Sequence, residues 1–390
     1  MIASRSLFVA ASLFSGFLFG SSALGEVPPE WRPKVVGGGE ARIAVAAPTD
    51  ERFAHLSWPK AHRAPDGTIV LAYTAGVFHG DHGGGSPAVS LSTDEGRTFT
   101  APHVLREFDR DHDYTQSGNL AIGTADDGAL VLLAMAYTGG RGGIVGKAGV
   151  GNNIYGWRST DNGRTWTPTD TSTLGPNKTG SVFGRLVDVP GQGLTALGHY
   201  RAPAKPAAGI WLAQSKDQGR TWGEPRQITE ADTAEPVLVV TENRWLAFLR
   251  GKKGNGRQHV AHSDDAGKTW STELSELAPP PNYSLAAPFA TVNPADPSEL
   301  LVLTNERSGT KATTPSTITL WRGKVDDRKW TRERVLVEMP KSADNPNKDL
   351  GYPWLLHQEG DRWQLYFYYG RSRGECALWV ADVAIPAKAP

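Results

Sequence analysis

The amino-acid sequence predicts an all-β fold, a six-bladed β-propeller built from four-stranded antiparallel blades. Two observations lead to it: an octet that occurs in four near-copies, and six turn signals that recur between short apolar runs. The composition is that of a globular chain, because 39% of the 390 residues are hydrophobic and 21% are charged. The 44 Gly and 27 Pro residues indicate many turns without reaching the level of a low-complexity sequence.

The octets share Ser, Asp, Gly and a Thr at fixed positions and end in an aromatic residue. They occupy residues 92–99, 159–166, 215–222 and 263–270. In each octet the Asp side chain can accept backbone N–H groups across a tight turn, and the Gly supplies a residue with positive φ. The terminal aromatic side chain can anchor the hairpin against its neighbours. Four copies in register therefore predict one hairpin per repeat, in which the Asp residue has a structural role.

The six turn signals separate strand-like runs, and each is interpreted as the turn after the first strand of a blade. They are Asp66-Gly67, Asp127-Gly128, Pro190-Gly191, Glu242-Asn243, Ala295-Asp296 and Glu359-Gly360. The first four blades carry the octets, the fifth carries a degenerate version at 326–330, and the sixth carries none. We expect residues 41–46 to supply the fourth strand of the sixth blade, because this closure protects the edges that an open sheet would expose.

The amino terminus has the pattern of a secretory signal peptide. Arg5 precedes an apolar stretch at 7–20, and Ala23-Leu24-Gly25 places small residues at a cleavage site. The stretch is too short and too often interrupted by Ser and Gly for a membrane span. The sequence thus predicts a signal peptide at 1–25, followed by a single propeller domain at 26–390 that is exported to the periplasm or the cell exterior.

The net charge and the cysteine content argue against some classes of function and site. The 41 Lys+Arg balance the 41 Asp+Glu, and loss of Arg5 with the signal peptide leaves a net charge of −1. This balance, with no long basic run, argues against nucleic-acid binding. The single Cys376 excludes an intramolecular disulfide and a thiolate zinc site. The sequence indicates no cofactor and leaves the oligomeric state open.

The strand order of a blade gathers polar residues on one face of a propeller. The start of each first strand and the loop after each second strand share the face on which propeller ligands usually bind. In blade order, the candidates there are His55, Ser57, His79, Asp81, His82, Tyr114, Gln116, Tyr137, Arg141, His199, Tyr200, Arg201, Glu235, Arg250, Arg307, Tyr352 and Arg371. Arg side chains bind carboxylates through paired hydrogen bonds. We therefore expect an acidic sugar of a glycan as the ligand.

The octet S-x-D-x-G-x-T-W is the Asp box, or BNR repeat, and the chain resembles the sialidase (neuraminidase)-like superfamily over nearly all of its exported part. The resemblance implies a glycoside hydrolase that uses a Tyr nucleophile, a Glu base, an Asp general acid and three Arg residues on the substrate carboxylate. Tyr352 matches the nucleophile and Glu235 its base, each before a Pro. Arg250 follows Glu235 by 15 residues, at the end of the next strand, where the superfamily has its second carboxylate-binding Arg. Asp81 lies in the loop that holds the general-acid Asp of the superfamily. A phenol suits an anomeric carbon that bears a carboxylate, because an anionic carboxylate nucleophile would be repelled.

The chain departs from the pattern of the superfamily at the other arginines. The first-blade motif Tyr-Arg-Ile-Pro appears here as Leu56-Ser57-Trp58-Pro59, the second Arg of that blade aligns near Gly76, and the third carboxylate-binding Arg falls at Pro315 or Ser316. Arg307 and Arg371 are candidates to rebuild an anion clamp from other loops. The expected substrate is thus a sialic-acid-like sugar, or another acidic sugar.

Three alternatives stay open at this point. A His/Tyr pair, with His55 or His199, could serve a polysaccharide lyase that eliminates across a uronate. The chain could also be a non-catalytic glycan-binding propeller that has lost the arginine triad. In the hydrolase interpretation, His55, His199 and Arg201 are candidates for substrate binding beside Arg250, Arg307 and Arg371. Finally, His79, Asp81 and His82 carry imidazole and carboxylate groups that suit a divalent metal ion, although three ligands in four residues of one loop rarely converge.

Overall fold

The computed structural model describes residues 27–76, 85–108, 114, 116–137, 153–175, 178–201, 204, 206, 208–309, 314–327, 329–341, 350–370 and 376–387. The expected signal peptide lies outside these residues. Helical structure in the described part is limited to four 3₁₀ turns, η1 (Pro29–Trp31), η2 (Glu51–Phe53), η3 (Ser172–Leu174) and η4 (Gly254–Gly256). None of them is long and apolar enough to cross a membrane. The rest of the regular structure is β-strand, as expected for an all-β protein.

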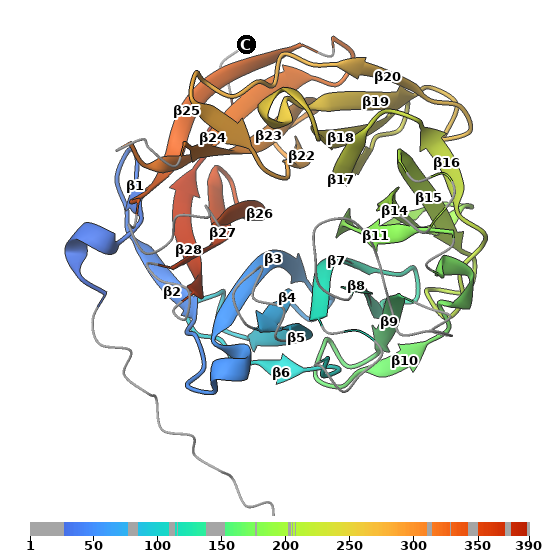
Figure 1. Ribbon diagram of the computed structural model, residues 1–390, viewed down its shortest axis with the longest axis horizontal. Helices are drawn as coiled ribbons and strands as arrows, with labels where there is room; N and C mark the ends of the chain where they lie inside the picture. Colours follow the sequence, from blue (N-terminus) through green and yellow to red (C-terminus); the bar gives the residue numbers. More distant parts are fainter. Residues whose placement is uncertain are drawn as a thin grey trace, which may run out of the picture.

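The strands of the described residues form five hydrogen-bonded sheets, which lie around a common centre (Figure 1). Three of them follow each other in the chain. The first contains β7 (Gln116–Thr124), β8 (Leu130–Tyr137), β9 (Ile154–Ser159), β10 (Thr167–Thr169) and β12 (Gly184–Arg185). The second contains β11 (Gly180–Val182), β13 (Val187–Val189), β14 (Gly193–Tyr200), β15 (Ile210–Ser215) and β16 (Arg226–Thr229). The third contains β17 (Thr233–Val240), β18 (Trp245–Gly251), β19 (His259–Ser263) and β20 (Ser271–Leu274).

The other two sheets contain the ends of the described chain. One is built from β1 (Lys34–Val35), β21 (Tyr283–Leu285), β22 (Phe289–Asn293), β23 (Asp296–Ser308), β24 (Ser316–Lys324) and β25 (Trp330–Met339). The other has eight strands, β2 (Ala41–Val45), β3 (His55–Arg63), β4 (Ile69–Gly76), β5 (Gly85–Ser92), β6 (His103–Val104), β26 (Gly351–Glu359), β27 (Arg362–Gly370) and β28 (Cys376–Ala384).

The eight-stranded sheet joins the first and the last antiparallel units of the chain. Its two halves meet through one parallel pair of residues, Cys376 and His55. Strand β2 pairs antiparallel with β28, so residues near the amino terminus of the described chain form the outer strand of the last unit. This confirms the expectation for residues 41–46, and it leaves no free edge on β28.

The strands differ from regular four-stranded antiparallel blades at two inner positions. The inner strand of the third unit is broken into β11, β12 and β13, and β12 pairs in parallel with β7 rather than with β14. The break lies at Gly184, whose φ is +96° and where a Cβ atom would lie 2.8 Å from the carbonyl oxygen of Pro236. The inner strand of the fifth unit is likewise split into β21 and β22, which both pair with β23. The predicted four-stranded blades did not include these breaks, because local periodicity does not report such close backbone approaches.

The four octets adopt the same hydrogen-bonded turn. In the second octet, Asp161 Oδ1 accepts from Ser159 Oγ and from the backbone N–H of Thr165, each at 2.8 Å, and Oδ2 accepts from Thr165 Oγ1 at 2.6 Å. The other three octets repeat these bonds. The residue before each Gly also has a positive φ, as at Asn162 (59°) and Ala266 (57°), which the sequence pattern did not indicate. The Asp carboxylates are thus used within their own turns.

Because of these bonds, the protein is expected to lose stability in acid. Hydrogen bonds from Thr and Ser lower the pKa of Asp94 and Asp265. At Asp161 and Asp217 burial acts to raise the pKa, but the same kinds of hydrogen bond outweigh burial, so that the pKa of both is lowered. A carboxylate whose pKa is lower in the folded state stabilises the fold above its unfolded pKa of about 4 and ceases to do so as the pH falls below that value.

The measurement is the thermal unfolding midpoint between pH 7 and pH 3. The midpoint of the wild type should fall steeply below about pH 4, whereas Asp265→Asn should be less stable at pH 7 and less sensitive to acid. Glu242→Gln, at an exposed turn position, is the matched control and should behave as the wild type does. A parallel pH dependence of wild type and Asp265→Asn would contradict the prediction.

Candidate active site

Three inner strands share an irregularity that turns one side chain out of the regular alternation. In β3, β17 and β26 the pairing register shifts around an X-Pro dipeptide, Trp58-Pro59, Glu235-Pro236 or Tyr352-Pro353. The residue before each Pro has a positive φ, 57° at Trp58 and 50° at both Glu235 and Tyr352. Non-glycine residues adopt this conformation at a cost of about 1–3 kcal/mol, and bulges of this kind redirect side chains near functional sites. The positions of Glu235 and Tyr352 therefore depend on a strained backbone.

Tyr352 and Glu235 are joined by a short hydrogen bond, although they lie 117 residues apart in the chain. The Tyr352 hydroxyl donates to Glu235 Oε1 at 2.6 Å. Both residues are buried, with exposures of 6% for Tyr352 and 7% for Glu235. A buried phenol that donates to a carboxylate is positioned to transfer its proton to that carboxylate when another group approaches its oxygen.

Arg250 completes this cluster from the end of β18. Its Nη1 donates to Glu235 Oε2 at 2.9 Å and to the Tyr352 hydroxyl oxygen at 3.3 Å. The side chain of Arg250 is 30% exposed, whereas those of Glu235 and Tyr352 are buried. Glu235, Arg250 and Tyr352, which the sequence placed on one face, are thus in direct contact.

The charges of this cluster are strongly coupled. Burial alone would raise the pKa of Glu235, but the Arg250 charge and the hydrogen bonds from Tyr352 and Arg250 hold it at about 2. Burial and, next, the Glu235 carboxylate raise the pKa of Tyr352 well above its usual range. In the resting state, therefore, Glu235 is a carboxylate, Tyr352 is a neutral phenol and Arg250 is a cation.

His199 supports the bulge that carries Glu235. The backbone N–H of Glu235 donates to His199 Nδ1 at 3.3 Å. Burial and then the nearby charge of Arg201 lower the pKa of His199 to about 3, so the imidazole is neutral and Nδ1 can accept this bond. Asn119 of β7, which the sequence did not single out, directs Nδ2 toward Glu235 Oε1 at 3.5 Å. From the neighbouring sheets, His199 thus holds the backbone of Glu235 and Asn119 approaches its carboxylate.

Arg307 approaches the cluster from the end of β23. Its guanidinium carbon lies 5.3 Å from the centre of the Tyr352 ring, and Nη2 donates to the carbonyl oxygen of Leu350 at 2.8 Å. Nη2 also lies 3.5 Å from the Tyr368 hydroxyl, and the Tyr368 ring is 6.3 Å from that of His55. Arg307 and His55 therefore border the same group of aromatic residues as Tyr352.

The remaining candidates lie further out or beyond the described residues. The Arg201 guanidinium carbon is 5.8 Å from the centre of the Tyr137 ring. Ser57, at the position of the absent first-blade arginine, is buried in β3. Asp81, Arg371, Arg141, His79 and His82 lie outside the described residues, so the proposed acid and the suggested metal cluster stay sequence-based expectations.

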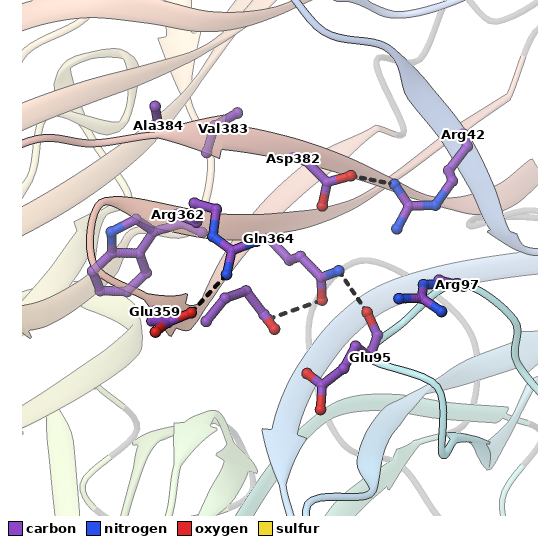
Figure 2. A pocket seen from close by; sticks show the side chains of 11 residues that line it. Arg42, Glu95, Arg97, Glu359, Arg362, Gln364, Asp382, Val383 and Ala384 are labelled. Carbon is purple, nitrogen blue, oxygen red and sulfur yellow. Dashed lines mark hydrogen bonds and ion pairs between the residues drawn. The ribbon is translucent and has the colours of Figure 1, made fainter.

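A cavity of about 920 Å³ lies elsewhere in the protein, and Figure 2 shows the residues that line it. It borders the turn end of β26 and the first octet, whereas Tyr352 stands at the other end of β26. Its polar side chains largely bond to one another: Arg42 donates to Asp382 at 2.6 Å, Arg362 to Glu359 at 2.8 Å, and Gln364 to the carbonyl oxygen of Glu95 at 2.9 Å. The bond from Gln364 connects the last antiparallel unit to the first octet.

Comparison with protein families and solved structures gives the following relatives. The family model described as "BNR repeat-like domain" matches residues 106–365. A search of curated protein sequences finds no match.

Among solved structures, a Dyadobacter fermentans protein of unknown function is 20% identical, with a TM-score of 0.63 over 88% of this chain and 99% of that one. A Hadza microbial sialidase is 18% identical, with a TM-score of 0.63 over 89% of this chain and 68% of that one. An α-L-arabinanase of Penicillium chrysogenum, complexed with arabinobiose, is 13% identical, with a TM-score of 0.58 over 88% of this chain and 97% of that one. The TM-scores show a fold shared with these proteins, and at identities this low the likeness extends to the fold alone.

Proposed function

Because the chain belongs to the BNR repeat-like domain family, we propose that its phenol–carboxylate–guanidinium cluster is the active site of an exported exo-glycosidase. The enzyme releases an acidic, sialic-acid-like sugar from the end of a glycan. The observation that carries the proposal is the contact of Tyr352, Glu235 and Arg250, in which the phenol donates at 2.6 Å to a buried carboxylate. In this proposal the eight-stranded sheet counts as two blades, so that six blades surround the site in a closed ring.

Tyr352 is the nucleophile of this reaction. Its oxygen forms a bond to the anomeric carbon as the bond to the leaving oxygen breaks, and its proton passes to Glu235. Asp81 donates a proton to the leaving oxygen and then accepts one from the water that attacks the same carbon. That attack breaks the bond to Tyr352, and Glu235 returns the proton to the phenolate. A neutral phenol avoids the repulsion that a carboxylate nucleophile would meet at a carbon bearing a carboxylate.

Arg250 and Arg307 supply the positive charge for the substrate carboxylate. Arg250 keeps part of its side chain exposed, and Arg307 lies over the Tyr352 ring. Two guanidinium groups beside the nucleophile attract an anionic sugar and orient its carboxylate. Ser57 in place of the first-blade arginine favours a carboxylate held by fewer arginines than in the sialidases. Arg371 and Arg201 are further candidates for the rim, and His55 and His199 border the bound sugar.

The test is release of free sugar from a panel of fluorogenic sialosides and other acidic glycosides. The wild type should turn over at least one of them, and Tyr352→Phe should lose about 10³-fold or more of kcat, because it removes the nucleophilic oxygen. Tyr369→Phe is the matched control, since the Tyr369 hydroxyl donates to the Pro340 carbonyl away from the cluster. Equal activity of wild type and Tyr352→Phe, or no release from any substrate, would refute the proposal. Unsaturated uronate products would indicate a lyase instead.

A further inference from the structure

A buried lysine lies beside the nucleophile and takes no part in the mechanism above. Lys60 belongs to the bulged part of β3 and is 1% exposed. Its Nζ donates to the carbonyl oxygens of Trp58 and Pro59 at 3.3 and 3.4 Å. An ammonium group has three N–H donors, and these two bonds are long. In the described part of the chain, Lys60 forms no ion pair with a carboxylate.

Aromatic rings surround the ammonium group instead. Nζ lies 4.2 Å from the centre of the Phe183 ring, 5.2 Å from that of Trp354 and 5.9 Å from that of Tyr352. The negative faces of aromatic rings attract a cation, more strongly where water is excluded. This cage therefore holds a positive charge directly beside the ring of the proposed nucleophile.

Burying the charged ammonium group of Lys60 costs free energy, which suggests that the charge has a function at this position. Burial lowers the pKa of Lys60 to about 7, although the Glu235 carboxylate acts in the opposite direction. An apolar side chain of the same length would avoid this cost. The charged or titratable groups that face Lys60 and the Tyr352 ring from other elements are Arg185 of β12, Glu235 of β17, Arg250 of β18, Arg307 of β23, Tyr352 of β26 and Tyr368 of β27.

We propose that Lys60 is a positioning residue whose ammonium stabilises the negative charge on the Tyr352 oxygen as its proton moves to Glu235. The inference rests on the proposed function, because it concerns the same proton transfer. Lys60 keeps its own protons and forms no bond to the substrate. It acts through Tyr352, from a point in the first blade close to Ser57, where the arginine of the superfamily is missing.

The experiment compares kcat and KM of Lys60→Met and of the wild type across pH, on the substrate that the glycoside panel identifies. Lys60→Met should lower kcat by about tenfold to hundredfold, the loss expected when a charge about 6 Å from the centre of the Tyr352 ring is removed at an effective dielectric constant of about 20. KM should change little, because Lys60 is buried away from substrate. The kcat of the wild type should fall as the pH rises above about 7, where Lys60 loses its charge, and this fall should disappear in Lys60→Met.

Two further variants make the outcome decisive. Lys60→Gln keeps hydrogen-bonding capacity without the charge and should show the same loss as Lys60→Met. Arg185→Met, which removes another cation beside the Trp354 ring, is the matched control and should keep the kcat and pH profile of the wild type. An unchanged kcat and pH profile in Lys60→Met, or an equal loss in Arg185→Met, would overturn the inference while the proposed function stands. A wild type that turns over no acidic glycoside would overturn both.

Discussion

Glu235→Gln is expected to lower kcat by about 10²–10⁴-fold, the range of a positioned general base. Gln has nearly the same shape and can still accept the hydrogen bond that Tyr352 donates at 2.6 Å, but it cannot take up the proton. The phenol of Tyr352 would then have to react without a base, although burial and the neighbouring carboxylate already raise its pKa. The measurement is kcat and KM on the sugar that the glycoside panel identifies.

The control for Glu235→Gln must also remove a buried Glu–Arg pair. Glu299→Gln does this in the fifth unit, where Glu299 is 4% exposed and accepts from Arg322 at 2.5 Å. Both variants should lose stability, because each removes a carboxylate from a buried guanidinium, although Arg322 keeps its ion pair with Glu333. Only Glu235→Gln should lose activity at a temperature at which both are folded. Equal activity of the two variants would show that Glu235 has a structural role alone.

Arg322→Met is expected to lower the free energy of unfolding by about 3–5 kcal/mol, since removing one partner leaves a buried charge uncompensated. Arg322 is 3% exposed and bonds to Glu299, to Glu333 and, at 2.6 Å, to the carbonyl oxygen of Pro386. Among the described residues, the side chain of Glu299 then keeps only the bond from Asn293 Nδ2, at 2.8 Å. Denaturant unfolding of the wild type and the variant measures the difference.

Two comparisons separate the buried charge from a general effect of substitution. The double variant Arg322→Met/Glu299→Met should recover much of the lost stability, because an apolar pair of similar volume needs no desolvated charge. Arg362→Met breaks an exposed ion pair with Glu359, whose side chains are 70% and 83% exposed, and should cost less than about 1 kcal/mol. If Arg322→Met were as mild as Arg362→Met, the buried cluster would contribute no more than a surface pair.

The sequence by itself determined the features that depend on short-range chemistry. The octets and turn signals mark the hairpins, because an Asp that accepts N–H groups and a Gly with positive φ act within a few residues. The alternation of strands and turns then sufficed to place Glu235, Arg250 and Tyr352 on one face. The resemblance to sialidases added the roles proposed for them.

The tertiary structure decided how these side chains meet and what surrounds them. Tyr352 and Glu235 bond across 117 residues, and Arg307 comes to lie over the Tyr352 ring. Lys60 enters an aromatic cage formed by two rings of β26 and by Phe183, which lies between β11 and β12. Such contacts depend on the order in which sheets surround the centre and on the bulges at the X-Pro dipeptides. A local sequence pattern reveals neither the order of the sheets nor the bulges, because burial and electrostatic coupling arise only when distant strands pack together.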